Sequence, residues 1–111
     1  MLYKIMIEFL CYVIFILVCQ AYDLAMTRCL YDSVPVHGPQ GITGPQKAYA
    51  CTNCMEFFAE LSVAYHWQSD DTTEYNKWFP HNRRQLQEHD PETFELLRSI
   101  WNGDMVINAV N

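Results

Sequence analysis

Two cysteines and two carboxylates stand close together in the stretch CTNCMEFFAE, residues 51–60. Cys51 and Cys54 form a Cys-x-x-Cys pair, a spacing that is used for zinc binding and for thiol–disulfide exchange. Glu56 and Glu60 are four residues apart, so on a helix both carboxylates lie on one face. The stretch can therefore do metal or redox chemistry through its cysteines, or metal chemistry through its glutamates.

The cysteine interpretation finds little support elsewhere in the sequence. A structural zinc site needs four ligands, but there is no second Cys-x-x-Cys, and no two of the four histidines are four residues apart. A thioredoxin-like motif expects a preceding strand in a βαβ unit, and only the helix after the pair is predicted. Cys54 is predicted to lie near a helix N-terminus, which lowers the pKa of a thiol. Ordinary thiols are therefore favoured, with zinc binding and redox chemistry as alternatives.

The glutamates also have a simple structural interpretation. Asn53 is a good N-cap, and Glu56 three positions later can complete a capping box. Glu60 is then a solvated charge on the same helix. In the functional alternative, one glutamate is a metal ligand and the other is a neighbouring group that orients a ligand.

The spacing of apolar residues predicts a mainly α fold, with α+β as an alternative: three or four helices and a short hairpin or irregular loop. Helices are expected over about 21–30, from Asn53 through the apolar face of Phe57 to Tyr65, and after Asp90-Pro91-Glu92 until Asn102-Gly103. The last helix should bury Phe94, Leu97, Ile100 and Trp101. Ser33–Val36 and Lys47–Ala50 are predicted to pair around a loop rich in Pro and Gly.

Residues 1–20 form an apolar leader with an uncharged run from Phe9 to Cys19. That run is short for a membrane span, which needs about 20 residues, and suits a secretory signal peptide with an exit at Cys19-Gln20-Ala21. A signal anchor, a buried core helix and a leader foreign to the natural product are the alternatives. If the leader is genuine, the protein is secreted or is membrane-anchored through residues 5–21.

The remaining residues, 21–111, suffice for one small domain over 21–102 followed by an irregular tail over 103–111. The net charge is −6, and no stripe of Lys and Arg is present. Such a chain lacks the basic surface with which proteins bind nucleic acids, so that class of partner is excluded.

Three aromatic residues precede Pro80 in the segment EYNKWFP. Tyr75, Trp78 and Phe79 are expected to pack a turn onto the helices, and a platform for a ligand is the alternative.

The segment YACTNCMEFFAE resembles the last part of the catalytic domain of anthrax toxin lethal factor. The shared pattern is Tyr-x-x-Thr-Asn-x-x-Glu-Phe-Phe-Ala-Glu, matched here by Tyr49, Thr52, Asn53, Glu56, Phe57, Phe58, Ala59 and Glu60. A downstream Pro-x-Thr-Phe, from Pro91 to Phe94, is also similar. The chain is more similar still to a family of eukaryotic and bacterial proteins related to that domain. Four strings carry this similarity, over roughly residues 21–102: AYDLAMTRCLYDSV, EFFAELSVAY, EYNKWFPHNRRQL and HDPETFELLRSIW.

This resemblance implies a zinc peptidase of the gluzincin type, in which a His-Glu-x-x-His helix gives two zinc ligands and the general base. A later helix gives a glutamate as third ligand. By position, Glu56 matches that ligand, Tyr49 matches a tyrosine that stabilises the transition state, and Glu60 matches a second carboxylate beside the ligand.

This chain departs from that pattern, because its sequence contains no His-Glu-x-x-His. The apolar leader stands where relatives carry that helix. The spacing of His66 and His81 from Glu56 matches no known arrangement of zinc ligands. A single carboxylate holds zinc poorly, so this chain alone is expected to bind no zinc and to hydrolyse no peptide.

Three hypotheses for the function follow. The first is an incomplete or degenerate metallopeptidase-like protein that is inactive as given; peptides or proteins are substrates only in complete relatives. The second is a small secreted or membrane-anchored interaction module without metal. The third is a hydrolase whose missing ligands come from another chain.

Overall fold

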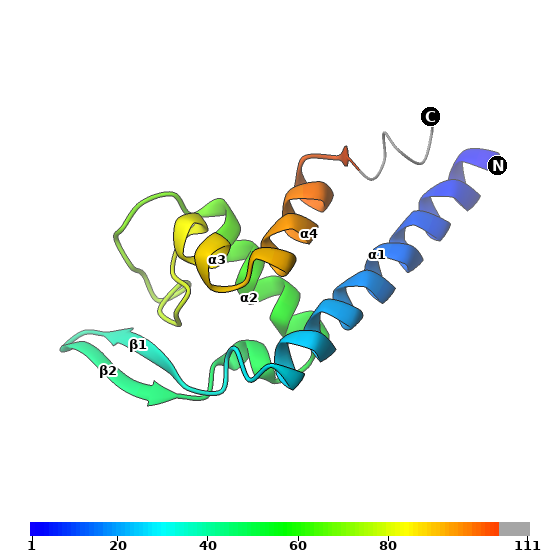
Figure 1. Cartoon of the computed structure of the whole chain (residues 1–111). Helices are drawn as coiled ribbons and strands as arrows, with labels where there is room; N and C mark the ends of the chain where they lie inside the picture. Colours follow the sequence, from blue (N-terminus) through cyan, green and yellow to red (C-terminus); the bar gives the residue numbers. More distant parts are fainter. Residues whose placement is uncertain (105–111) are drawn as a thin grey trace.

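The computed structural model describes residues 1–104 and confirms a mainly α fold with a small antiparallel sheet (Figure 1). Residues 105–111 lie outside the described part, and with them most of the predicted tail. The elements in chain order are α1 (Leu2–Thr27), β1 (Val34–Gly38), β2 (Gly41–Gln46), the 3-10 turn η1 (Tyr49–Cys51), α2 (Cys54–His66), α3 (Arg83–His89) and α4 (Pro91–Trp101).

Helix α1 is continuous, so the helix predicted over about 21–30 is the last part of a longer one that begins at Leu2 and ends at Thr27. The first proline of the chain is Pro35 and the first glycine is Gly38, so no helix breaker interrupts residues 2–27, which form one helix. Its C-terminal third packs on the core, where Ala25 is buried and Tyr22 donates a hydrogen bond to the Cys51 carbonyl at 2.6 Å. No residue between 2 and 17 is buried, and we call these residues the apolar arm.

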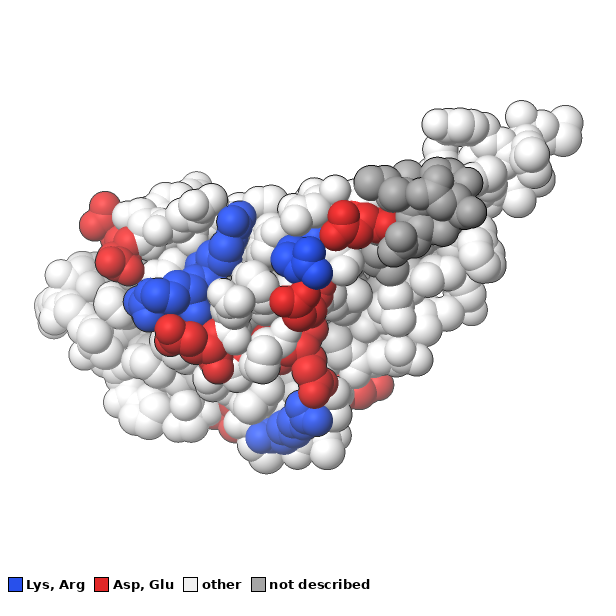
Figure 2. Space-filling model, turned by 45° about the horizontal axis from the view of Figure 1, so that its top comes forward, with Lys and Arg blue, Asp and Glu red and all other residues white. Residues whose placement is uncertain are grey.

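The apolar arm projects away from the other elements, so the molecule measures 53 × 28 × 22 Å (Figure 1). Charged side chains on the face drawn in Figure 2 lie over the folded part, and the projecting end is uncharged there. The sequence places Lys4 and Glu8 within the arm.

Helix α2 lies at the centre of the fold and contacts α1, α3 and α4. Asn53 caps it as predicted, since its side-chain oxygen accepts a hydrogen bond from the Glu56 N–H at 2.8 Å. The predicted apolar face is buried at Phe57, Leu61, Ala64 and Tyr65. Burying a large apolar side chain contributes about 1.5–3 kcal/mol, so this face supplies much of the driving force for folding.

Tyr31 connects the end of α1 to the rest of the core. Its side chain is fully buried, its ring contacts the rings of Phe57 and His89 edge to face, and its hydroxyl donates to Asp90 Oδ2 at 2.8 Å. Its carbonyl accepts from the Ala48 N–H at 2.9 Å and from the Cys51 thiol at 3.3 Å. Burial, with the nearby Asp90 carboxylate, raises the pKa of Tyr31 far above its ordinary value, so the hydroxyl stays a donor.

Asp90 is the predicted N-cap of α4, and its Oδ1 accepts from the Thr93 N–H at 3.2 Å. Helix α3, which was not foreseen, ends at the same corner. His89 is half-buried there, with Nε2 2.6 Å from the Leu30 carbonyl. In the last helix Phe94 and Leu97 are buried as predicted, but Ile100 is half-buried and Trp101 is 45% exposed.

The hairpin has a different register from the predicted one. β1 pairs with β2, with His37 opposite Ile42 and Gly38 opposite Gly41, so the turn is Pro39-Gln40. Gly41 has φ +98°, which favours glycine and allows the chain to reverse at once. Residues 47–50 therefore lie beyond the hairpin and lead into η1.

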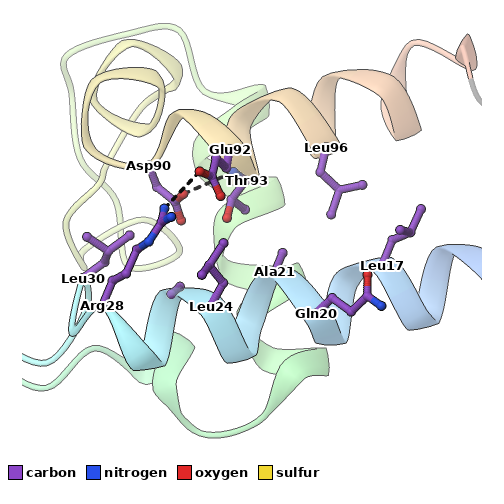
Figure 3. Close-up of a pocket in the computed structure, with 11 residues that line it drawn as sticks. Leu17, Gln20, Ala21, Leu24, Arg28, Leu30, Asp90, Glu92, Thr93 and Leu96 are labelled. Carbon is purple, nitrogen blue, oxygen red and sulfur yellow. Dashed lines mark hydrogen bonds and ion pairs between the residues drawn. The ribbon is translucent and has the colours of Figure 1, made fainter.

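Helices α1 and α4 lie side by side and enclose a small groove (Figure 3). Leu17 and Leu24 from α1 face it together with Leu96 from α4. At one end Arg28 pairs with Glu92 at 3.0 Å; both side chains are at least half exposed, so this pair contributes little. A disulfide between Cys19 and Cys54 covalently joins α1 to the start of α2.

Replacing Tyr31 by Phe should destabilise the protein, because the Asp90 carboxylate oxygen then loses its buried donor. We expect a loss of about 1–3 kcal/mol in the free energy of unfolding, measured by thermal or urea unfolding of the full chain in detergent micelles. Tyr3→Phe is the matched control, since Tyr3 is 77% exposed and should leave stability unchanged. Equal stability of the two variants would show that the Tyr31–Asp90 bond does not hold the corner.

Candidate functional site

Tyr49 and Glu60 line one cavity of about 370 Å³. Tyr49 is the first residue of η1, and Glu60 lies in α2, one helical turn after Glu56. The other lining residues come from α2 and from the segment between α2 and α3: Ala59, Val63, Glu74, Tyr75, Lys77 and Trp78. Two of the three site residues implied by the family resemblance therefore face the same space.

Glu56 lies beside this cavity rather than in its lining. It belongs to the first turn of α2, where its N–H is held by Asn53 and its carboxylate adds negative charge near the helix N-terminus. Its side chain is half-buried, and its charge acts on Glu60 one turn later. The helix thus brings both carboxylates to one face, as their spacing predicted.

Glu60 has an unfavourable environment for a carboxylate. Burial raises its pKa first, the Glu56 charge raises it further, and Lys77 partly offsets both. No other described side chain donates a hydrogen bond to Glu60 or pairs with it. The cavity is therefore a place where negative charge is incompletely compensated.

Within residues 1–104, no three His, Cys, Asp or Glu side chains are grouped as a metal site requires. His66 lies at the end of α2 with its ring against Tyr65 and Trp101. His81 lies in the loop before α3 against the ring of His37. The structure therefore does not bring either histidine together with Glu56 in a metal-binding group.

The two cysteines of the Cys-x-x-Cys pair have separate partners. Cys54 forms the disulfide with Cys19, a pairing that the sequence interpretation missed. Cys51 is buried and its thiol donates to the Tyr31 carbonyl. Burial raises the pKa of the Cys51 thiol, with Asp32 adding to the rise and Lys47 opposing it, so Cys51 is a poor nucleophile.

A histidine pair that sequence reasoning did not single out lies beside a second cavity, of about 450 Å³. The His37 and His81 rings are 4.1 Å apart between centroids, and Nδ1 of His81 is 2.8 Å from the Asn76 carbonyl. That contact requires a proton on Nδ1, and Nε2 then has no partner among the described residues. Burial lowers the pKa of His81, and the nearby His37 lowers it further. The carbonyls of Asn76 and Trp78 act in the opposite direction but do not outweigh burial, so the neutral ring is favoured.

The aromatic residues before Pro80 have two different roles: some pack the turn onto the core, and others face a cavity. Phe79 and Trp78 pack against the core, as expected. Tyr75 is 72% exposed and, with Trp78, faces the Tyr49–Glu60 cavity. The Lys77 ammonium lies 6.0 Å from the centroid of the Trp78 ring. Tyr75, Lys77 and Glu74 are thus additional site residues, and the only sequence signal for them was the concentration of aromatic residues near Pro80.

Comparisons of the chain with protein families, with curated proteins and with solved structures find no match. The resemblance to metallopeptidases therefore stays a hypothesis that rests on the sequence pattern.

Replacing Glu60 by Gln should stabilise the protein slightly at pH 7. A carboxyl whose pKa is raised in the native state disfavours folding when ionised, and this cost disappears as the pH falls through the raised pKa. We expect the melting temperature of Glu60→Gln to exceed the parent's by roughly 1–3 °C at pH 7, and the difference to shrink towards pH 4. Glu88→Gln, on the exposed side of α3, should show no such pH-dependent gain. A Glu60→Gln variant less stable than the parent at pH 7 would contradict this account of the site.

Proposed function

We propose that the chain is a membrane-anchored binding module without hydrolytic activity of its own, attached to a lipid bilayer through the apolar arm. The observation that carries this proposal is the exposure of the arm: Leu2, Tyr3, Phe9 and Tyr12 are each more than 60% exposed. Large exposed apolar surfaces on a folded protein are typical of contact with a membrane or with another protein.

The length and composition of α1 support a lipid environment. It is long and apolar enough to cross a membrane, with a mean hydropathy of 2.2 over its most apolar window, of which only 6% is buried. A helix in the core of a soluble domain would be mostly buried. The 16 residues of the arm extend about 24 Å, close to the roughly 30 Å of a bilayer core.

The distribution of apolar residues distinguishes a bilayer from a protein groove. From Phe9 to Val18 the sequence FLCYVIFILV contains no charged residue, so the helix is apolar around its whole circumference. A helix that docks in a groove on a partner needs one apolar stripe and keeps a polar opposite face. Lys4 lies near the N-terminal end, where a long side chain can reach the polar headgroups.

The junction between the arm and the domain supports retention of the arm. Val18 is buried, Cys19 is joined to Cys54, and the helix continues without a break into the part that packs on α2. Cleavage of the backbone after Ala21, as in a secretory signal peptide, would leave the arm attached through the disulfide. A disulfide also favours an oxidising compartment for the domain.

Membrane attachment is tested by flotation of the full chain with phosphatidylcholine liposomes in a density gradient. We expect the parent to float and Phe9→Asp/Tyr12→Asp to stay in the dense fractions, since a buried charge costs about 2.5–3.5 kcal/mol in the middle of a membrane helix. Ile42→Asp is the matched control, because Ile42 is 66% exposed on β2, outside the arm, and should float like the parent. Flotation of the double variant to the same extent as the parent would contradict attachment through the arm.

A second candidate function is that of a degenerate gluzincin-like protein, which the Tyr-x-x-Thr-Asn-x-x-Glu-Phe-Phe-Ala-Glu pattern favours. Tyr49 and Glu60 share one cavity, as residues of a former catalytic wall would, and Glu56 would be the third zinc ligand in complete relatives. On this proposal the given sequence carries the glutamate part of a zinc site, and it contains no His-Glu-x-x-His.

Zinc titration by calorimetry tests this second candidate. We expect no binding tighter than about millimolar at neutral pH, because one carboxylate holds zinc weakly. Micromolar binding that Glu56→Ala abolishes would mean that the chain, alone or as an assembly, forms a complete site. Micromolar binding abolished by Cys51→Ser instead would point to the cysteine.

A further inference from the structure

The Tyr49–Glu60 cavity has the chemistry of a cation-binding site. Three aromatic side chains line it, Tyr49 from η1 and Tyr75 and Trp78 from the segment before Pro80. Aromatic rings attract cations through the negative charge on their faces, with Trp the strongest. Ala59 and Val63 of α2 supply an apolar wall beside the rings.

Two carboxylates in the lining add acceptors for a charged donor. Glu60 and Glu74 both face the cavity, and Lys77 is its only cationic lining residue. Among residues 1–104, neither carboxylate has a hydrogen-bond or ion-pair partner in another side chain, and Glu56 adds a further negative charge next to Glu60. The cavity therefore favours a cation and disfavours an anion.

Lys77 shows what the cavity can hold. Its ammonium already lies 6.0 Å from the centroid of the Trp78 ring, which is within the range of a cation–π contact. The Lys77 side chain is exposed and its carbonyl is fixed by the His37 N–H at 2.8 Å, so the side chain can swing outwards without movement of the backbone. An external ammonium would take the place that the chain's own lysine occupies.

We propose that this cavity binds a primary ammonium group, namely the lysine side chain of a protein partner. A primary ammonium donates three hydrogen bonds, which suits two carboxylates without donors, whereas a quaternary ammonium donates none. The volume of about 370 Å³ lies within the range of small-molecule sites, and it accommodates a lysine stem against Ala59 and Val63. This inference names a partner for the proposed binding module but does not require membrane attachment.

Binding is measured by NMR titration of the full chain in detergent micelles with Nα-acetyl-lysine methylamide. The matched control ligand is Nα-acetyl-norleucine methylamide, which has a similar stem but no ammonium. We expect the lysine ligand to shift the amide signals of residues 59–63 and 74–78, and the norleucine ligand to leave them unchanged. Equal shifts with both ligands, or shifts elsewhere only, would overturn the assignment.

Four variants test the individual contributions. Tyr75→Leu, Glu60→Gln and Glu74→Gln should each weaken binding about two- to fivefold, and Lys77→Met should strengthen it by removing the internal competitor. Glu88→Gln, outside the cavity, should leave affinity unchanged. Glu60→Gln is expected to fold at least as well as the parent, so weaker binding by this variant cannot reflect unfolding. If Lys77→Met bound the lysine ligand more weakly than the parent, the idea that the ligand displaces the Lys77 ammonium would be overturned.

Two further ligands separate a protein lysine from other amines. The trimethylated lysine ligand and choline should bind more weakly than the lysine ligand, because neither donates a hydrogen bond from nitrogen. Tighter binding of choline would overturn the assignment to a protein partner and point to a lipid headgroup. Because these titrations are made in micelles, they succeed or fail independently of the liposome flotation experiment.

Discussion

The buried hydrogen bond from Tyr31 to Asp90 connects most parts of this small fold. Asp90 both receives that bond and caps α4, so the corner between α3 and α4 is fixed to the segment that follows α1. The Tyr31 ring packs on Phe57 of α2, and its carbonyl holds the residues that enter η1. A chain of this size buries a limited core. A single side chain that joins several elements, as Tyr31 does, therefore contributes a large share of what fixes their arrangement.

The cavity proposed as a binding site depends on the hairpin as well as on the helices. Val36 of β1 forms a bridge with Trp78, the His37 N–H donates to the Lys77 carbonyl, and the Phe79 N–H donates to the Pro35 carbonyl at 3.1 Å. These contacts fix the segment that carries the aromatic wall. Strand β2 is exposed along its length and pairs with β1, which it completes and stiffens. The aromatic wall of the cavity therefore depends on β1, a short strand that is itself anchored by the burial of Val34 and Val36.

Local patterns predicted the elements whose signals are local. Asn53 and Asp90 were recognised as N-caps because their side chains bond within three residues, and the apolar spacing of α2 follows from one helix face. Helix α3 was missed because it buries a single residue, Leu86, and so lacks a repeating apolar pattern. The predicted hairpin register was wrong because the register is set by the turn at Gly41 and by pairing with residues 77–79, which are distant in sequence. The Cys19–Cys54 disulfide and the grouping of Tyr49 with Tyr75 likewise depend on tertiary packing.

The disulfide between Cys19 and Cys54 also determines how mechanical load would pass through the molecule. The two cysteines are 35 residues apart in sequence, and they join α1 directly to the first residue of α2. Tension applied along α1 from its N-terminal end would reach the central helix through this covalent link. Residues 20–53, which include the hairpin and Tyr31, form a closed loop that such tension bypasses. The hairpin and the residues that enter η1 therefore lie outside the covalent path of force from the arm to α2.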